Sequence, residues 1–65
     1  MTLQELSVQY QESARLLAEG LALVRAELKT ARGDAALDLR RREELLAEEL
    51  GDTLRTARWL RDYYR

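Results

Sequence analysis

Two clusters of charged residues in this 65-residue chain have types and spacings that chemistry could use. The acidic cluster consists of Glu43, Glu44, Glu48 and Glu49. On a helix these carboxylates lie on neighbouring turns, and some helical bundles hold metal ions with carboxylates placed in this way. Such centres also use Glu-x-x-His pairs, and the chain contains no His. We therefore interpret the cluster as a solvated acidic face, and the sequence predicts no metal site and no cofactor.

The basic cluster lies near the end of the chain and repeats every three or four residues: Arg55, Arg58, Arg61 and Arg65. On a helix that spacing keeps guanidinium groups along one side, where they can contact phosphates or form the polar rim of an interface. Nucleic-acid binders usually carry a basic excess, whereas this chain has a net charge of −1. We expect the arginines mainly to pair with Glu5 and Glu12 of the other half, with phosphate contact as the alternative.

The tripeptide Arg32-Gly33-Asp34, near the middle of the chain, is the sequence that integrins recognise in extracellular proteins. The same residue types suit the junction between two helices. Gly33 can adopt the left-handed conformation that ends a helix, and Asp34 can cap the next helix. We interpret the tripeptide as this junction.

The chain contains few residue types that could perform catalysis. The chain has no Cys and no His, which removes thiol nucleophiles, disulfides and the usual general base near neutral pH. No nucleophile–base pair or phosphate-binding loop can be written down, so we predict that the protein is not an enzyme. The opening residues lack the features of a signal peptide, and charges interrupt every apolar run. We expect a cytoplasmic protein without membrane contact.

The elements that position these residues are predicted to be helices. The chain contains 14 Leu and 9 Ala but only two Val, no Ile and no Phe, a balance that favours helices over strands. Thr2-Leu3-Gln4-Glu5 fits the capping box that starts a helix. The predicted fold is an all-α, antiparallel two-helix hairpin, with a first helix over about 3–32, a turn at 33–34 and a second helix over about 35–63.

A heptad pattern predicts the seam between the helices. Its first-helix members are Leu3, Ser7, Tyr10, Ala14, Leu17, Leu21, Val24, Leu28 and Ala31. Its second-helix members are Ala36, Leu39, Glu43, Leu46, Leu50, Thr53, Ala57, Leu60 and Tyr64. Antiparallel pairing sets large residues against small ones and joins Leu21 to Leu46. Only Val24 opposite Glu43 is unfavourable; the glutamate could set the register, lie at the rim or mark a local shift.

Large apolar residues also lie off the seam: Leu16, Leu23, Leu37, Leu45, Leu54 and Trp59. A hairpin of this size buries a single seam, and so small a core seldom suffices alone. We expect an interface that contains Leu16, Leu23, Leu45 and Trp59. The simplest result is a homodimer in the form of an antiparallel four-helix bundle.

The Thr2-Leu3-Gln4-Glu5-Leu6 opening, the arginine-rich second half and the closing Arg61-Asp62-Tyr63-Tyr64-Arg65 resemble short uncharacterised helical proteins of Gram-positive bacteria and their mobile elements. That resemblance implies no particular activity. In architecture the chain also resembles the small helical-hairpin dimers of the Rop type. This second resemblance implies binding of paired RNA loops along one face of a bundle.

The sequence therefore predicts a non-enzymatic protein–protein interaction or adaptor module. Its expected partner is a second copy of the chain, with another helical protein as a further possibility. The mechanism would be docking of helix faces, with the arginine series as polar rim. The alternative is a small Rop-like regulator that binds nucleic acid through those arginines.

Overall fold

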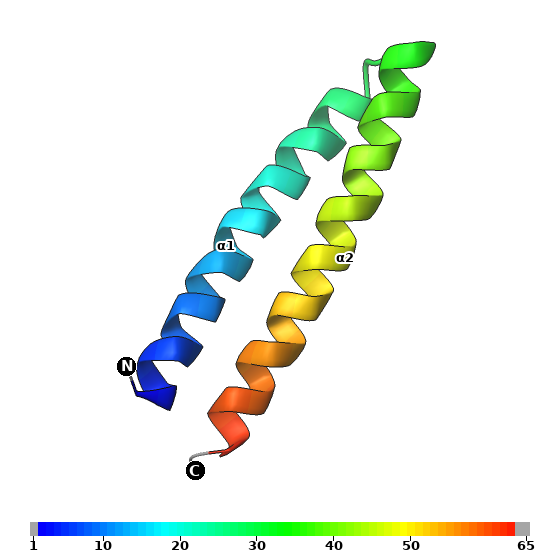
Figure 1. Cartoon of the computed structure of the whole chain (residues 1–65). Coiled ribbons are helices and arrows are strands. Elements are labelled where there is room, and N and C mark those ends of the chain that lie inside the picture. The colour runs from blue at the N-terminus through cyan, green and yellow to red at the C-terminus, as the bar shows by residue number, and fades with distance from the viewer. Residues whose placement is uncertain (1, 64–65) are drawn as a thin grey trace.

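The computed structural model describes residues 2–63 and contains two long helices that run antiparallel, side by side (Figure 1). Helix α1 spans Leu3–Leu28 and helix α2 spans Asp34–Tyr63. The hairpin measures 48 × 16 × 14 Å. The predicted all-α hairpin is thus confirmed. Over the described residues, neither helix is long and apolar enough to cross a membrane.

Helix α1 begins at the predicted cap. Thr2 has extended backbone angles, and its hydroxyl oxygen accepts a hydrogen bond of 3.0 Å from the backbone N–H of Glu5. The Thr2 carbonyl accepts the first helical bond from the N–H of Leu6, also at 3.0 Å. The side chain therefore satisfies one of the backbone donors that every helix leaves free in its first turn.

Helix α1 ends at Leu28, so the prediction that it continues to about residue 32 is wrong. The backbone hydrogen bonds tighten to three-residue spacing there, beginning with the Lys29 N–H, which donates to the Ala26 carbonyl at 3.3 Å. The Glu27 carbonyl accepts from the Thr30 N–H at 3.2 Å, the Ala31 N–H at 3.0 Å and the Thr30 hydroxyl at 3.3 Å. The three-residue backbone bond of Thr30 marks the tightened last turn; its hydroxyl bond does not by itself end a helix, since Thr56 donates to the Asp52 carbonyl inside α2.

Gly33 adopts the predicted left-handed conformation, with φ of 62°, but at a different structural position. It does not end α1. Its carbonyl accepts hydrogen bonds from the N–H groups of Ala36 at 3.1 Å and Leu37 at 3.2 Å, so it is the N-cap of α2. Asp34, predicted as the cap, is instead the first residue of the helix, where its carboxylate suits the positive end of the helix dipole.

Burial confirms the heptad seam. Its buried members are Ser7, Ala14, Leu21, Val24, Ala57 and Leu60. The other described members are half-buried, except Leu3 at the open end of the hairpin. Ser7 is the most deeply buried, at 1 % exposure, and its hydroxyl oxygen lies 3.5 Å from the Gln11 amide nitrogen that donates to it. The predicted seam position Tyr64 lies outside the described residues.

Glu43, the unfavourable seam position, is a rim residue. Its side chain is half-buried, and one carboxylate oxygen accepts a hydrogen bond of 3.0 Å from Nε of Arg25 on α1. Arg25 directly follows Val24, the predicted partner of Glu43, so this contact agrees with the predicted register to within one residue. The carboxylate reaches out of the seam to its partner and thereby avoids the cost of an unpaired buried charge.

Two glycines should respond oppositely to substitution. A Cβ at Gly20, inside α1, would meet no atom within 4 Å, so Gly20→Ala should raise the free energy of unfolding by ~0.5–1 kcal/mol. Gly33→Ala should lower it by ~1–2 kcal/mol because of the positive φ. Urea denaturation followed by circular dichroism, at low protein concentration, measures both changes. Equal effects in the two variants would contradict this account of the turn.

Candidate functional site

The four predicted interface residues are all exposed. The exposed fractions are 55 % for Leu16, 66 % for Leu23, 61 % for Leu45 and 61 % for Trp59. Tyr63 is exposed as well, and its ring centroid lies 5.3 Å from that of Trp59. The hairpin seam therefore leaves these side chains uncovered, as the heptad pattern predicts.

Two depressions between the helices show which flanks of α1 and α2 share a side. Glu27 of α1 lines one depression together with Asp38 and Arg42 of α2. Gln11 of α1 lines another together with Arg58 and Arg61 of α2. Residues three or four apart stay on one flank of a helix, so each depression identifies a whole row of residues on each helix.

The first depression belongs to the broad side that we call the leucine face. Leu16 and Leu23 lie in the α1 row of Glu27, and Leu45 lies in the α2 row of Asp38 and Arg42. The row on α2 continues through Glu49, Asp52, Trp59 and Tyr63. The predicted interface residues of both helices thus occupy one side of the hairpin.

The second depression belongs to the opposite broad side, the arginine face. Its α1 row contains Gln11, Arg15, Ala18, Ala22 and Arg25. Its α2 row contains Arg40, Glu44, Ala47, Gly51, Leu54, Arg58 and Arg61. The Arg25–Glu43 ion pair lies on this side. Small residues occupy the middle of the arginine face, the exposed Leu37 and Leu54 lie on either side of them on α2, and charged residues lie toward both ends.

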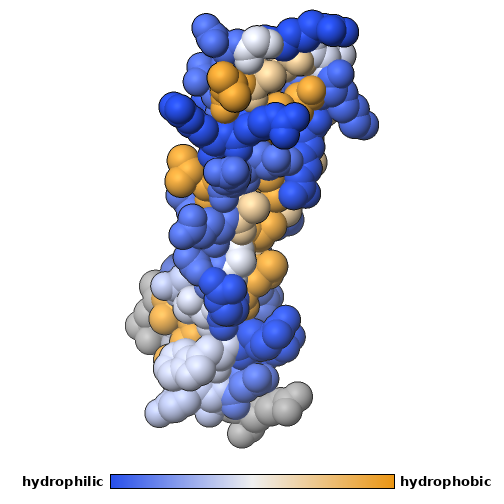
Figure 2. Space-filling view, turned by 90° about the vertical axis from the view of Figure 1, so that its right-hand side faces the viewer, coloured by the Kyte–Doolittle hydropathy of each residue, from blue (hydrophilic) through white to orange (hydrophobic). Residues whose placement is uncertain are grey.

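The outer surface of α2 separates these two faces. Figure 2 looks onto it and shows a mostly hydrophilic surface on which apolar patches are interrupted by charged side chains. Leu37, which is 59 % exposed, does not belong to this outer surface: it lies one turn before Arg40, in the α2 row of the arginine face. The apolar surface of the hairpin is thus divided among separate rows.

The three described arginines near the end of α2, Arg55, Arg58 and Arg61, have different surroundings. Arg58 and Arg61 line the depression with Gln11, whereas Arg55 forms an ion pair with Asp52 on its own helix. Arg61 Nε lies 3.9 Å from the Asp62 carboxylate. The predicted member Arg65 lies outside the described residues.

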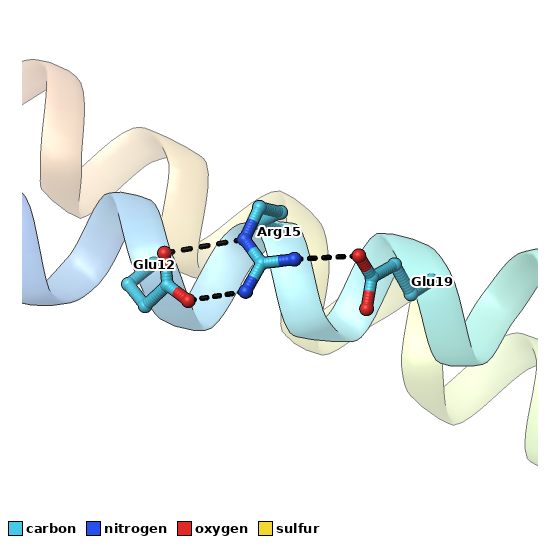
Figure 3. Close-up of polar contacts among 3 residues, drawn as sticks. All are labelled: Glu12, Arg15 and Glu19. Carbon is cyan, nitrogen blue, oxygen red and sulfur yellow. Dashed lines mark hydrogen bonds and ion pairs between the residues drawn. The ribbon is translucent and has the colours of Figure 1, made fainter.

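The prediction that these arginines pair with Glu12 is wrong. Glu12 instead binds Arg15 one turn along α1, and Arg15 Nη1 also donates to Glu19 at 2.6 Å (Figure 3). Ion pairs within a helix need only short side-chain excursions, so they compete well with pairs across the seam. Within residues 2–63, Arg25–Glu43 is the single ion pair between the helices.

The acidic cluster is not gathered around a common point. Glu43 faces Arg25 across the seam, and Glu44 lies in the row of the arginine face. Glu48 and Glu49 are exposed farther along α2. In the part of the chain that the structure describes, no three carboxylates are placed to hold a metal ion together.

No protein-family model, curated protein or solved structure matches this chain. The functional argument therefore comes from the surface of the hairpin. The segregation of charge between the two faces is the feature that sequence reasoning missed. The sequence does contain a signal for this segregation, because residues of one row recur every three or four positions. The spacing becomes informative only when it is known which row of α1 lies on the same side of the hairpin as which row of α2.

The pKa of Glu12 offers a local test of the ion-pair network. Its hydrogen bond to the Arg15 guanidinium, together with the charge of that group, lowers the pKa from its ordinary value of 4.5. A lowered carboxyl pKa stabilises the fold at neutral pH and ceases to do so as the pH falls through it. Arg15→Gln should return the pKa of Glu12 toward 4.5 in an NMR titration. Lys29→Gln is the control, and an equal rise there would refute the assignment.

Proposed function

We propose that the protein is a non-enzymatic interaction module that acts by self-association into a helical bundle. The observation that carries this proposal is the exposure of Leu16, Leu23, Leu45 and Trp59 on one side of a hairpin. Exposed large apolar side chains that share a face mark an interaction surface more often than a solvated one. The smallest assembly would be a homodimer in the form of a four-helix bundle.

The thinness of the seam supports self-association. Of the buried seam residues, Ser7, Ala14 and Ala57 have small side chains, so Leu21, Val24 and Leu60 are the large apolar residues that are fully covered. A two-helix unit with so few buried large side chains gains much by burying a further face. A second hairpin provides that cover, and another helical protein is the alternative partner. We place this activity in the cytoplasm, in keeping with a chain that lacks Cys.

Self-association predicts a melting temperature that rises with protein concentration, because mass action favours the assembled form. Sedimentation equilibrium should give a mass above that of one chain, and Trp59 emission should shift to the blue as its exposed ring becomes covered. Leu23→Lys should weaken association at least tenfold. Ala26→Lys, at an exposed position on the outer surface of α1, is the control and should leave association unchanged.

A small nucleic-acid-binding regulator is the second candidate function. The observation that favours it is the depression in which Arg58 and Arg61 lie beside Gln11, since guanidinium and amide groups both donate hydrogen bonds to phosphate oxygens. Against it stand the net charge of −1 and the carboxylates that already bind Arg55 and Arg25. We therefore rank it below self-association.

The two functions differ in their dependence on salt. A nucleic-acid regulator would bind structured RNA with an affinity that falls steeply from low to physiological salt, because phosphate contacts release counterions. We expect no micromolar complex at physiological salt in a fluorescence-anisotropy titration. A complex that forms there and is lost in Arg58→Glu, with helical content and mass unchanged, would favour the regulator instead.

A further inference from the structure

We infer that copies of the chain associate through unlike surfaces, with the leucine face of one hairpin packed on the arginine face of the next. This inference rests on the proposed self-association and specifies its geometry. A two-fold dimer would use the same patch on both subunits, whereas packing of unlike faces is heterologous and leaves one face free at each end. The assembly would then extend beyond a dimer as concentration rises.

Charge is the first reason. Beside its apolar residues, the leucine face carries Glu27, Asp38, Glu49 and Asp52 against one base, Arg42. The arginine face carries Arg15, Arg25, Arg40, Arg58 and Arg61 against Glu43 and Glu44. Packing two leucine faces together would bring acidic rims against each other, whereas unlike faces set acids against bases. Complementary rims select partners and orientation even where each exposed pair contributes little energy.

Several of these charged groups have no ion-pair partner in their own hairpin, which also favours contact between unlike faces. Within residues 2–63, Glu27, Asp38 and Glu49 on the leucine face have no ion-pair partner. On the arginine face, over the same range, Arg40 and Arg58 have none. These groups can pair with a second copy without first giving up a partner in their own hairpin.

Side-chain size is the second reason. The leucine face presents Leu16, Leu23 and Leu45 as large projecting side chains. The middle of the arginine face presents Ala18, Ala22, Ala47 and Gly51, which leave room for such side chains between the exposed Leu37 and Leu54 on α2. Large residues that pack over small ones give the interdigitation that helix interfaces require. Two leucine faces would oppose large residues to large ones.

The dimensions fit a second copy as the occupant. A broad side of the described hairpin extends over 48 by 16 Å. That outline is comparable to the ~800 Å² per partner that a standard-size interface buries. A hairpin of the same length, laid along the face, covers the rows from Trp59 to Glu27 in one contact, so that apolar residues and both charged ends are engaged together.

Two complementary variants test the inference. Leu45→Glu adds a charge at the centre of the leucine face, and Ala47→Arg adds a bulky charge at the centre of the arginine face. Both positions are exposed in the single hairpin, and Glu and Arg are good helix formers, so the helical content should stay unchanged. Ala26→Glu, at an exposed position on the outer surface of α1 and outside both rows, is the matched control.

In sedimentation experiments, we expect each blocked variant alone to have the mass of one chain. Their equimolar mixture should form a dimer and stop there, because the leucine face of Ala47→Arg meets the arginine face of Leu45→Glu and the remaining faces are blocked. Wild type and the Ala26→Glu control should grow beyond a dimer with concentration. Raising the salt concentration should weaken the contact, because screening reduces the attraction between the acidic rim of one face and the basic rim of the other.

Two results would overturn the inference and are distinguishable. Dimers of Ala47→Arg alone, strengthened by salt and not increased by mixing, would show a two-fold contact between leucine faces; self-association itself would then stand. Wild type with the mass of one chain at every concentration would refute both self-association and its geometry.

Discussion

The packing of α1 against α2 along one narrow seam is the interaction on which the rest of this structure depends. Most seam side chains are small or only half-buried, and Leu21, Val24 and Leu60 are its large apolar members that are buried. Because the seam holds the helices antiparallel along their whole length, it also determines which rows of the two helices share a side. The chemical character of each broad side is therefore a consequence of seam register.

The seam could be predicted from sequence because its signal repeats. Apolar residues at heptad spacing recur over both helices, and one unfavourable position, Glu43, does not alter the period. The outcome at Glu43 shows how such a position is accommodated: it lies at the rim, and its carboxylate reaches Arg25. Periodicity averages over many residues, so it tolerates a single polar member.

Features that depend on a single local competition were harder to predict. The end of α1 is marked by the backbone bonds of Lys29 and Thr30, which change from four-residue to three-residue spacing. Similarly, Arg15 lies within one turn of both Glu12 and Glu19, so short local pairs form in place of pairs across the seam. Residue type and spacing allow both outcomes in each case, and small differences in geometry decide between them.

The candidate site could be predicted from sequence better than these local features but less well than the seam. Each row of exposed residues is periodic and visible in the sequence, but joining the α1 row of Leu23 to the α2 row of Leu45 requires the side on which each row lies. The depression shared by Glu27 and Asp38 provides that link. Once the rows are joined, unpaired acids and most of the large exposed apolar residues occupy one side, while bases and small residues, with Leu37 and Leu54 beside them, occupy the other. The proposed contact between copies uses this difference in charge and size, and it needs no residue beyond those that the seam leaves exposed.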